Sequence, residues 1–314
     1  MSVKAAMQDL LLVNQARAII KRGSKSFAAA TKLFAPAIRD DVILLYAWCR
    51  HCDDLTDGQE FGHGFISTAS AETLQRMRSD SLSAVAGNPS DHLPYLALSE
   101  LAKRYPINRI LVEDHIRGFE MDVQGWQPQT LKDTLTYCYH VAGVVGIMMA
   151  RLMGVQDAAT LHRANDLGIA FQLTNIARDV VEDAMAGRSY LPREWLIDSN
   201  LTIEDLAKPS QHERVYPLVQ RLIRESEPYY DSAMIGIREL PTRAAWAVAS
   251  ARLIYQDIGK ILLERGPVVL SQRVFTKKSQ KLWRMLESLP GVLANQAPPT
   301  RNAREGLWTP TSVT

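Results

Sequence analysis

The chain has 314 residues, 46% of them hydrophobic, and a formal net charge of +2. A chain of this length and composition buries a large core, and so small a net charge argues against nucleic acid as its main partner. Three cysteines are too few for a disulfide framework and favour a reducing compartment.

No secretory signal is evident near the N-terminus. The longest uncharged apolar stretch, residues 141–150, is much shorter than a membrane span. We therefore expect a soluble protein that touches a membrane surface at most.

Helical periodicity dominates the chain. Strand-like alternation bounded by hairpin turns is missing, so we predict about ten helices in an all-α, single-domain helical bundle over residues 1–294. The tail, residues 295–314, contains three prolines and is predicted to be disordered. Prolines are expected to separate the helices, at Pro36, Pro89, Pro94, Pro106, Pro128, Pro192, Pro209, Pro217, Pro228 and Pro241.

The first distinctive helix ends in the acidic run Asp53-Asp54-Leu55-Thr56-Asp57. Tyr46, Arg50, Asp53 and Asp57 fall at i, i+4, i+7 and i+11 and share one face of this otherwise apolar helix. Two carboxylates one turn apart repel by about 0.2–0.5 kcal/mol even when solvated. Such a stripe on a helix that reads as buried predicts a cation or a cationic partner at this face.

Cys49 and Cys52 lie in the same helix and form a CxxC pair. A redox or zinc role is one interpretation of that spacing. No second CxxC or His pair completes a zinc site, so we interpret both as packing residues.

The segment from Tyr137 to Gly146 reads as helical but contains two glycines, each costing about 1 kcal/mol relative to Ala in a helix interior. Gly143 and Gly146 share a face, which predicts that a neighbouring helix or a long hydrocarbon chain approaches the backbone there. Taken alone, Tyr137 is more typical of a core aromatic than of a catalytic residue.

A second acidic run, Asp179-Val180-Val181-Glu182-Asp183, repeats the pattern of the first. Gln172, Asn175, Asp179 and Asp183 fall at i, i+3, i+7 and i+11 on one helix face. The loop at residues 187–192 follows this run, as the loop at residues 59–70 follows the first, and both are expected to close over a bound anion.

Two solvated acidic faces would explain either stripe alone. Both occur with an arginine close by, Arg50 and Arg178, and the pair favours a site for hard cations. Carboxylate oxygens suit Mg²⁺ or Mn²⁺, which complete their shells with water and substrate phosphates. Such a site suits a substrate that carries a diphosphate. If that substrate is an allylic diphosphate, its loss leaves a carbocation, which needs a dry cavity with aromatic faces that stabilise it.

These residues resemble the squalene/phytoene synthases, the family that joins two prenyl diphosphates head to head, and are most similar to its bacterial carotenoid-pathway members. The likeness runs from Gly23 to about Phe275. The motifs that carry it are Ser24 to Phe27, Tyr46 to Asp57, Gly118 to Asp122, Tyr137 to Gly146, Gln172 to Asp183 and Arg188 to Pro192.

The resemblance implies an isoprenoid synthase bundle with a central active-site cavity. It implies that Mg²⁺ or Mn²⁺ is held by Asp53, Asp57, Asn175, Asp179 and Asp183. It implies substrate-binding roles for Ser24, Ser26, Phe27, Tyr46, Arg50, Gln172, Arg178, Tyr255 and Arg273. Asp53, Asp57, Asp179, Asp183, Arg50 and Tyr137 are implied to be catalytic, with Phe27 and Tyr137 lining the cavity of the cation.

The implied reaction condenses two geranylgeranyl diphosphate molecules to phytoene through a cyclopropyl (prephytoene) diphosphate, the first committed step of carotenoid biosynthesis. No NADPH is expected, because Gly62-His63-Gly64 lacks the rest of a dinucleotide fingerprint. The resemblance implies a cytoplasmic enzyme, and the apolar product suggests peripheral contact with the inner face of the membrane. The oligomeric state is not indicated.

Three alternatives stay open. A dehydrosqualene synthase would use farnesyl diphosphate, and cavity depth, which periodicity does not measure, separates the two substrates. A head-to-tail prenyl elongase or terpene cyclase also uses paired aspartate motifs, but Arg50 and the Tyr137–Gly146 segment favour the head-to-head family. A non-catalytic binding protein of the same fold would not need both intact acidic runs. A di-iron carboxylate bundle is disfavoured because no Glu-x-x-His pair is present.

Overall fold

The computed structural model describes residues 11–20, 31–57, 70–272, 274, 278–293 and 304–310. Within these residues the regular structure is entirely helical, as predicted, and no strand is present. The chain divides into two compact units: residues 1–124 with 148–155, and residues 125–147 with 156–314. Of the three passages between the units, the one between residues 147 and 148 lies inside a helix, and the other two, after residues 124 and 155, lie in non-helical connections. The single domain over residues 1–294 stays a prediction.

The first unit is built around α3 (Pro36–Asp57), which packs against α4 (Ala71–Val85), α5 (Leu93–Arg104) and α6 (Arg109–Val123). Proline at the first position of α3 suits a helix start, because its missing N–H would have no partner there. Ser70 and Asn108 cap α4 and α6 by accepting backbone N–H bonds at 3.1 Å.

Trp48 of α3 is the largest fully buried side chain of this unit. Its indole N–H donates to Ser81 Oγ of α4 at 3.1 Å, and its ring lies 5.2 Å from that of His115 of α6. This contact fixes the rotation of α3 about its own axis and so turns the opposite face, with Tyr46 and Arg50, away from the core.

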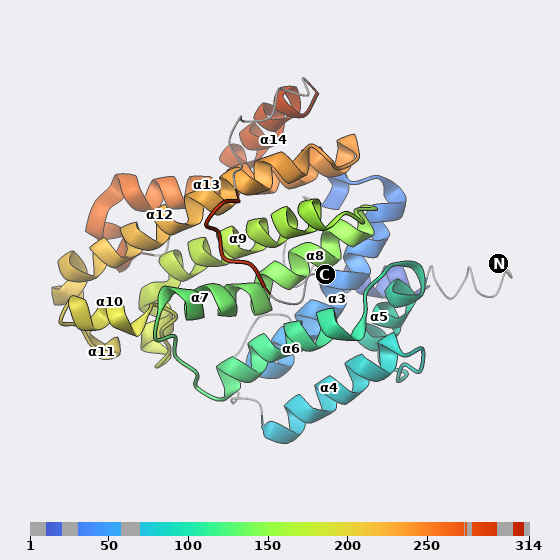
Figure 1. Cartoon of the computed structure of the whole chain (residues 1–314), viewed down its shortest axis with the longest axis horizontal. Helices are drawn as coiled ribbons and strands as arrows, with labels where there is room; N and C mark the ends of the chain where they lie inside the picture. Colours follow the sequence, from blue (N-terminus) through green and yellow to red (C-terminus); the bar gives the residue numbers. More distant parts are fainter. Residues whose placement is uncertain are drawn as a thin grey trace, which may run out of the picture. The chain divides into compact units, whose positions relative to one another are not determined.

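The second unit is built around α9 (Ala158–Met185), which lies beside α12 (His212–Ile237), α13 (Thr242–Arg265) and α7 (Leu131–Cys138) (Figure 1). Asp157 caps α9 by accepting the Thr160 N–H at 2.8 Å. After α9, Gly187 adopts φ +73°, a left-handed conformation that favours glycine and turns the chain back. The remaining elements of this unit are α10 (Arg193–Asp198), α11 (Ile203–Leu206), η3 (Pro209–Gln211), η4 (Gly266–Ser271) and α14 (Lys278–Leu293).

Two of the prolines expected between helices lie inside one. Pro217 and Pro228 both fall within α12. An internal proline removes a backbone hydrogen bond and costs about 3 kcal/mol. The helix continues because its apolar face is buried along α9, with Val215, Val219 and Leu222 fully covered.

The helix after residue 130 changes type in its middle. α7 is followed without a break by a π-helical turn, η2 (Tyr139–Gly143), and then by α8 (Val144–Leu152). The whole stretch, Leu131–Leu152, is the one candidate membrane span among the described residues, with 22 residues and a mean hydropathy of 1.3. Since 61% of its most apolar window is buried inside the protein, this is weak evidence for membrane insertion, because a core helix passes the same test.

Part of the tail predicted to be disordered packs on the second unit. Residues 304–310 lie across α9 and are held by polar and aromatic contacts (Figure 1). Composition does not predict this ordered segment, because its contacts depend on two residues, Arg304 and Trp308, that bind distant parts of the chain.

Candidate functional site

The first acidic stripe lies on the C-terminal half of α3. Arg50 is its centre: its guanidinium forms an ion pair with Asp53 at 2.7 Å and donates from Nε to Asp54 Oδ1 at 2.9 Å. Arg50 and Asp54 are each 16% exposed, whereas Asp53 is 42% exposed. Asp53 is therefore the more accessible of these two carboxylates.

The charges around Arg50 affect the groups beside it. Burial disfavours its charged form, but the Asp54 and Asp53 carboxylates outweigh that penalty, so the pKa of Arg50 is raised. Burial also raises the pKa of Tyr46. Arg50 lowers this pKa, whereas the carboxylates of Asp53 and Asp54 raise it further. Arg50 thus stays cationic and Tyr46 stays a neutral hydroxyl at physiological pH.

The second acidic stripe lies on α9. Arg178 donates from Nε to Asp179 Oδ1 at 2.7 Å and makes a second short bond to the other carboxylate oxygen. Both side chains are about one-sixth exposed, at 18% and 17%. Burial disfavours the charged form of Arg178, but Asp179 outweighs it and raises the pKa of Arg178.

Asn175, one turn before Asp179, has a buried amide oxygen with no hydrogen-bond partner. Its Nδ2 contacts Gln172 Oε1 at 3.4 Å, and its side chain acts on Tyr255 of α13, whose pKa it lowers. Burial raises the pKa of Tyr255, with Arg178 opposing. Tyr255 in turn stacks on Phe171, with ring centroids 4.1 Å apart. A buried acceptor without a donor costs free energy unless a ligand, ion or water satisfies it.

An aromatic stack lies in the same unit. Tyr137 lies between Tyr190 and Trp126, with ring centroids at 4.5 and 6.1 Å and interplanar angles of 17° and 18°. The loop after α9 brings Tyr190 to this place, and Thr134 Oγ1 fixes it by donating to the Tyr190 carbonyl at 3.0 Å. A cation is stabilised over an open ring face, and in this stack the outer faces of Trp126 and Tyr190 are the ones that are not covered by Tyr137.

The two glycines of the Tyr137–Gly146 segment meet α9, which confirms the predicted close approach and identifies a helix as its cause. A Cβ on Gly143 would lie 2.2 Å from Asn165 Oδ1, and one on Gly146 would lie 2.4 Å from the Ala164 carbonyl oxygen. The contact is reciprocal, since a Cβ on Gly168 would lie 2.4 Å from the Ala142 oxygen. The two helix backbones therefore touch.

The face of α9 that touches η2 is the face that bears the acidic stripe. Asn165, Gly168, Gln172, Asn175 and Asp179 follow at i, i+3, i+7, i+10 and i+14. The N-terminal half of this face packs on η2, and the C-terminal half carries the polar groups. The close packing of Gly168 against Ala142 and Gly143 therefore fixes the position along α9 after which the polar side chains of this face begin.

Several predicted site residues lie outside the described part of the chain. They are Ser24, Ser26, Phe27 and Arg273, and the side chain of Asp57, the last residue of α3. Asp183 lies in the last turn of α9 and is partly buried. The two stripes belong to different compact units, so their facing each other across a common cavity stays a prediction.

The donor set fits a hard divalent cation. α9 carries the Asp179 and Asp183 carboxylates and the Asn175 amide; both Asp179 oxygens are bonded to Arg178, whereas Asn175 Oδ1 is a buried acceptor with no partner. Among the described residues there is no group of three or more His, Cys, Asp or Glu side chains able to hold a metal ion. Because Mg²⁺ usually combines one or two carboxylates with water and substrate phosphates, such a set suits a cation that arrives with a diphosphate.

Sequence reasoning missed four contributors. Asp54 lies off the stripe of Tyr46, Arg50 and Asp53, yet it is a principal partner of Arg50. Trp126, Phe171 and Tyr190 are not among the predicted site residues. Only the Arg188–Pro192 motif, which contains Tyr190, could have indicated one of them.

Comparison with known proteins gives consistent results. The squalene/phytoene synthase family matches residues 20–280. A phytoene synthase of Pseudescherichia vulneris is 45% identical over 303 residues, which cover 95% of this chain and 97% of the relative. A 15-cis-phytoene synthase of Pantoea ananas is 44% identical over 307 residues, covering 96% and 99%. Among solved structures, a dehydrosqualene synthase in complex with a ligand is similar at a TM-score of 0.80 and 26% identity, covering 92% of this chain and 99% of that one.

Proposed function

Because the chain belongs to the squalene/phytoene synthase family, we propose that it joins two molecules of geranylgeranyl diphosphate head to head to give phytoene, the first committed step of carotenoid biosynthesis. The observation that carries the proposal is the composition of the α9 site. Asp179 paired with Arg178, and the unpartnered Asn175 oxygen, lie in the same unit as the Trp126–Tyr137–Tyr190 stack.

The polar residues would bind the diphosphate. We assign Asn175, Asp179 and Asp183 on α9, with Asp53 and Asp57 on α3, as ligands of Mg²⁺ or Mn²⁺. When bound, the metal supplies positive charge to the diphosphate oxygens and stabilises them as a leaving group. Arg178 and Arg50 keep their charge, and in this proposal they would bind non-bridging oxygens. Gln172, Tyr255 and Tyr46 supply neutral hydrogen-bonding groups beside them.

The aromatic residues would hold the organic part of the substrate. Loss of diphosphate leaves an allylic cation, which the double bond of the second substrate attacks, and loss of a proton closes the cyclopropyl diphosphate. Loss of its diphosphate, rearrangement of the resulting cation and loss of a second proton would then give phytoene. Tyr137 is 4% exposed and stacks on Tyr190, so the aromatic side that we assign to the substrate is built from side chains largely withdrawn from water. A dry aromatic wall lets the cation rearrange rather than be captured by water.

A substrate comparison tests the proposal. Purified protein with Mg²⁺ and no NADPH is expected to turn geranylgeranyl diphosphate into phytoene, a C40 hydrocarbon extracted into hexane and identified by its triene chromophore and mass. The same assay with farnesyl diphosphate is expected to be at least tenfold slower. A faster C15 reaction giving a C30 hydrocarbon would establish dehydrosqualene synthesis instead, the activity named for one similar structure. No hydrocarbon from either substrate would refute the enzymatic proposal.

The apolar product leads us to propose a cytoplasmic enzyme that touches an anionic membrane through α14. Trp283 and Leu286 lie one turn apart on this helix and are 65% and 57% exposed. The other side of the helix is fixed to α13, where Trp246 donates to the Met285 carbonyl at 2.6 Å and Ser250 contacts Ser288 at 2.9 Å. The sequence places Lys277, Lys278 and Lys281 just before this apolar pair. Basic residues beside exposed apolar ones suit anionic lipid headgroups.

Vesicle sedimentation tests the membrane contact. With phosphatidylglycerol vesicles, the double variant Trp283→Ala/Leu286→Ala is expected to bind at least about fivefold less than wild type, because it loses the apolar area that enters the headgroup layer. The matched control is Ile197→Ala, since Ile197 is 64% exposed on α10, a different helix of the same unit. Equal binding by wild type and the double variant would exclude α14 as the contact.

A further inference from the structure

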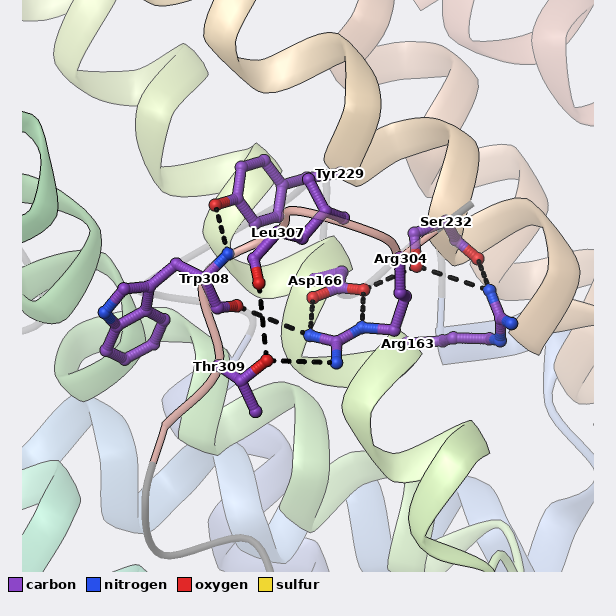
Figure 2. A network of polar contacts seen from close by, with 8 residues as sticks. All are labelled: Arg163, Asp166, Tyr229, Ser232, Arg304, Leu307, Trp308 and Thr309. Carbon is purple, nitrogen blue, oxygen red and sulfur yellow. Dashed lines mark hydrogen bonds and ion pairs between the residues drawn. The ribbon is translucent and has the colours of Figure 1, made fainter. Parts of the chain in front are cut away.

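The segment Arg304–Pro310, which we call the C-terminal strap, is held by a buried ion pair. Arg304 donates from Nε and Nη2 to the two carboxylate oxygens of Asp166 at 2.6 and 2.7 Å (Figure 2). Asp166 lies on α9 and its side chain is 0% exposed, whereas Arg304 is 16% exposed. Ser232 of α12 also donates to Asp166 Oδ2, at 2.5 Å.

The strap is shaped to present this arginine. Gly306 adopts φ +81°, and the Leu307 N–H returns to the Arg304 carbonyl at 3.1 Å, which closes a turn. The remaining guanidinium bonds go to the strap itself, to Thr309 Oγ1 at 3.3 Å and the Trp308 carbonyl at 3.4 Å (Figure 2). The guanidinium thus makes two hydrogen bonds to Asp166 and two to the strap itself, which leaves this planar group little freedom to move.

A second anchor joins the strap to the π-helical turn. The backbone N–H of Trp308 donates to the Tyr229 hydroxyl at 3.3 Å. The indole ring of Trp308 lies 5.8 Å from the ring of Tyr139, measured between centroids. Tyr139 is the first residue of η2. The strap therefore contacts both members of the tight α9–η2 pair, at Asp166 and at Tyr139.

The position of Asp166 links this contact to the proposed metal site. The residue before it, Asn165, touches Gly143 and begins the face that continues through Gln172 to Asp179. A carboxylate with no solvent exposure needs its partner, because an unpaired buried charge is strongly destabilising. Buried ion pairs add little to stability compared with apolar packing, and the best-attested reason to keep one is that it fixes a register.

We propose that Arg304 is a positioning residue: through Asp166 and Trp308 the strap fixes the register of α9 against η2, and so places Asn175 and Asp179 for binding metal and diphosphate. This inference rests on the proposed function. Asn175 is nine residues along α9 from Asp166, about 14 Å at 1.5 Å per residue, so the effect of the strap is transmitted along the helix.

Metal binding, measured apart from turnover, tests the inference. Mn²⁺ affinity is followed by electron paramagnetic resonance in the presence of inorganic diphosphate, with the full-length protein. Arg304→Gln is expected to raise the Mn²⁺ dissociation constant at least fivefold and to lower kcat at least tenfold. The matched control is Arg284→Gln, because Arg284 makes a similar two-bond pair with Asp257, at 2.6 and 2.5 Å, between α14 and α13. The control is expected to change Mn²⁺ affinity less than twofold.

A double variant separates positioning from stability. Asp166→Asn/Arg304→Gln no longer buries an unpaired charge, so its melting temperature is expected to recover toward wild type while Mn²⁺ affinity and kcat stay low. A purely structural role predicts that all three recover together, which would overturn the inference. If Arg304→Gln alone does not fold, the double variant carries the same comparison. Absence of Mn²⁺ binding by wild type would refute the proposed metal site, whereas equal binding by wild type and the variants would refute only the strap.

Discussion

Replacing Asp179 by asparagine is expected to lower kcat/KM for geranylgeranyl diphosphate by about 10²–10³-fold. The substitution keeps the size of the side chain but removes the charge that faces Arg178 and that we assign to the metal. Asparagine oxygens are weaker ligands than carboxylates for Mg²⁺. The rate is measured by extraction of labelled hydrocarbon at saturating Mg²⁺, and folding is checked by circular dichroism.

Asp198→Asn is the control for Asp179. Asp198 carries the same charge, belongs to the same unit and is exposed on α10, a different helix from α9. Its rate is expected to stay within about twofold of wild type, since surface charges contribute little. Near-normal turnover by Asp179→Asn would remove Asp179 from the metal site, and a large loss in Asp198→Asn would show that the effect is not specific to the stripe.

Adding one methyl group at Gly168 is expected to lower the free energy of unfolding by roughly 3 kcal/mol. The new Cβ would lie 2.4 Å from the Ala142 carbonyl oxygen and 2.7 Å from Gly143 Cα, and both are backbone atoms that cannot rotate away. α9 and η2 must separate to admit it, which also shifts the polar half of the α9 face. Urea unfolding measures the first effect and kcat the second.

Gly259→Ala provides the comparison for Gly168→Ala. Gly259 lies in α13, where a Cβ would meet only the Ile223 side chain, at 3.3 Å. A small shift of that side chain is enough, and alanine is favoured over glycine in a helix by about 1 kcal/mol. Stability is therefore expected to stay level or rise. Similar losses in both variants would show that helix packing at Gly168 is no tighter than elsewhere.

The sequence predicts what periodicity and local chemistry control. The helical class, the two stripes and the close approach at Gly143 and Gly146 all follow from residues a few positions apart. The structure confirms the helices and the glycine contact. The ion pair between Arg178 and Asp179 likewise joins residues that are adjacent in the sequence.

What the sequence could not predict depends on distant partners. Pro217 and Pro228 lie inside α12 because burial along α9 outweighs the proline penalty, and no local signal reports that burial. Arg50 is within reach of both Asp53 and Asp54 in the sequence. Their spacing does not predict that the Asp54 side chain is the less exposed of the two, because exposure depends on packing. The strap joins residues 138 positions apart, from Asp166 to Arg304, which composition alone made to look unstructured.

The π-helical turn Tyr139–Gly143 has a consequence for how this helix can change. Such a turn holds one residue more than an α-helical turn, and the extra residue is taken up within the turn. Removing one residue there would return the turn to α-helical geometry and leave Gly146 and the rest of α8 facing the same way, whereas removing one residue elsewhere in the helix would rotate everything after it by about 100°. The turn is therefore the place where this helix can change its length by one residue and keep its contact with α9.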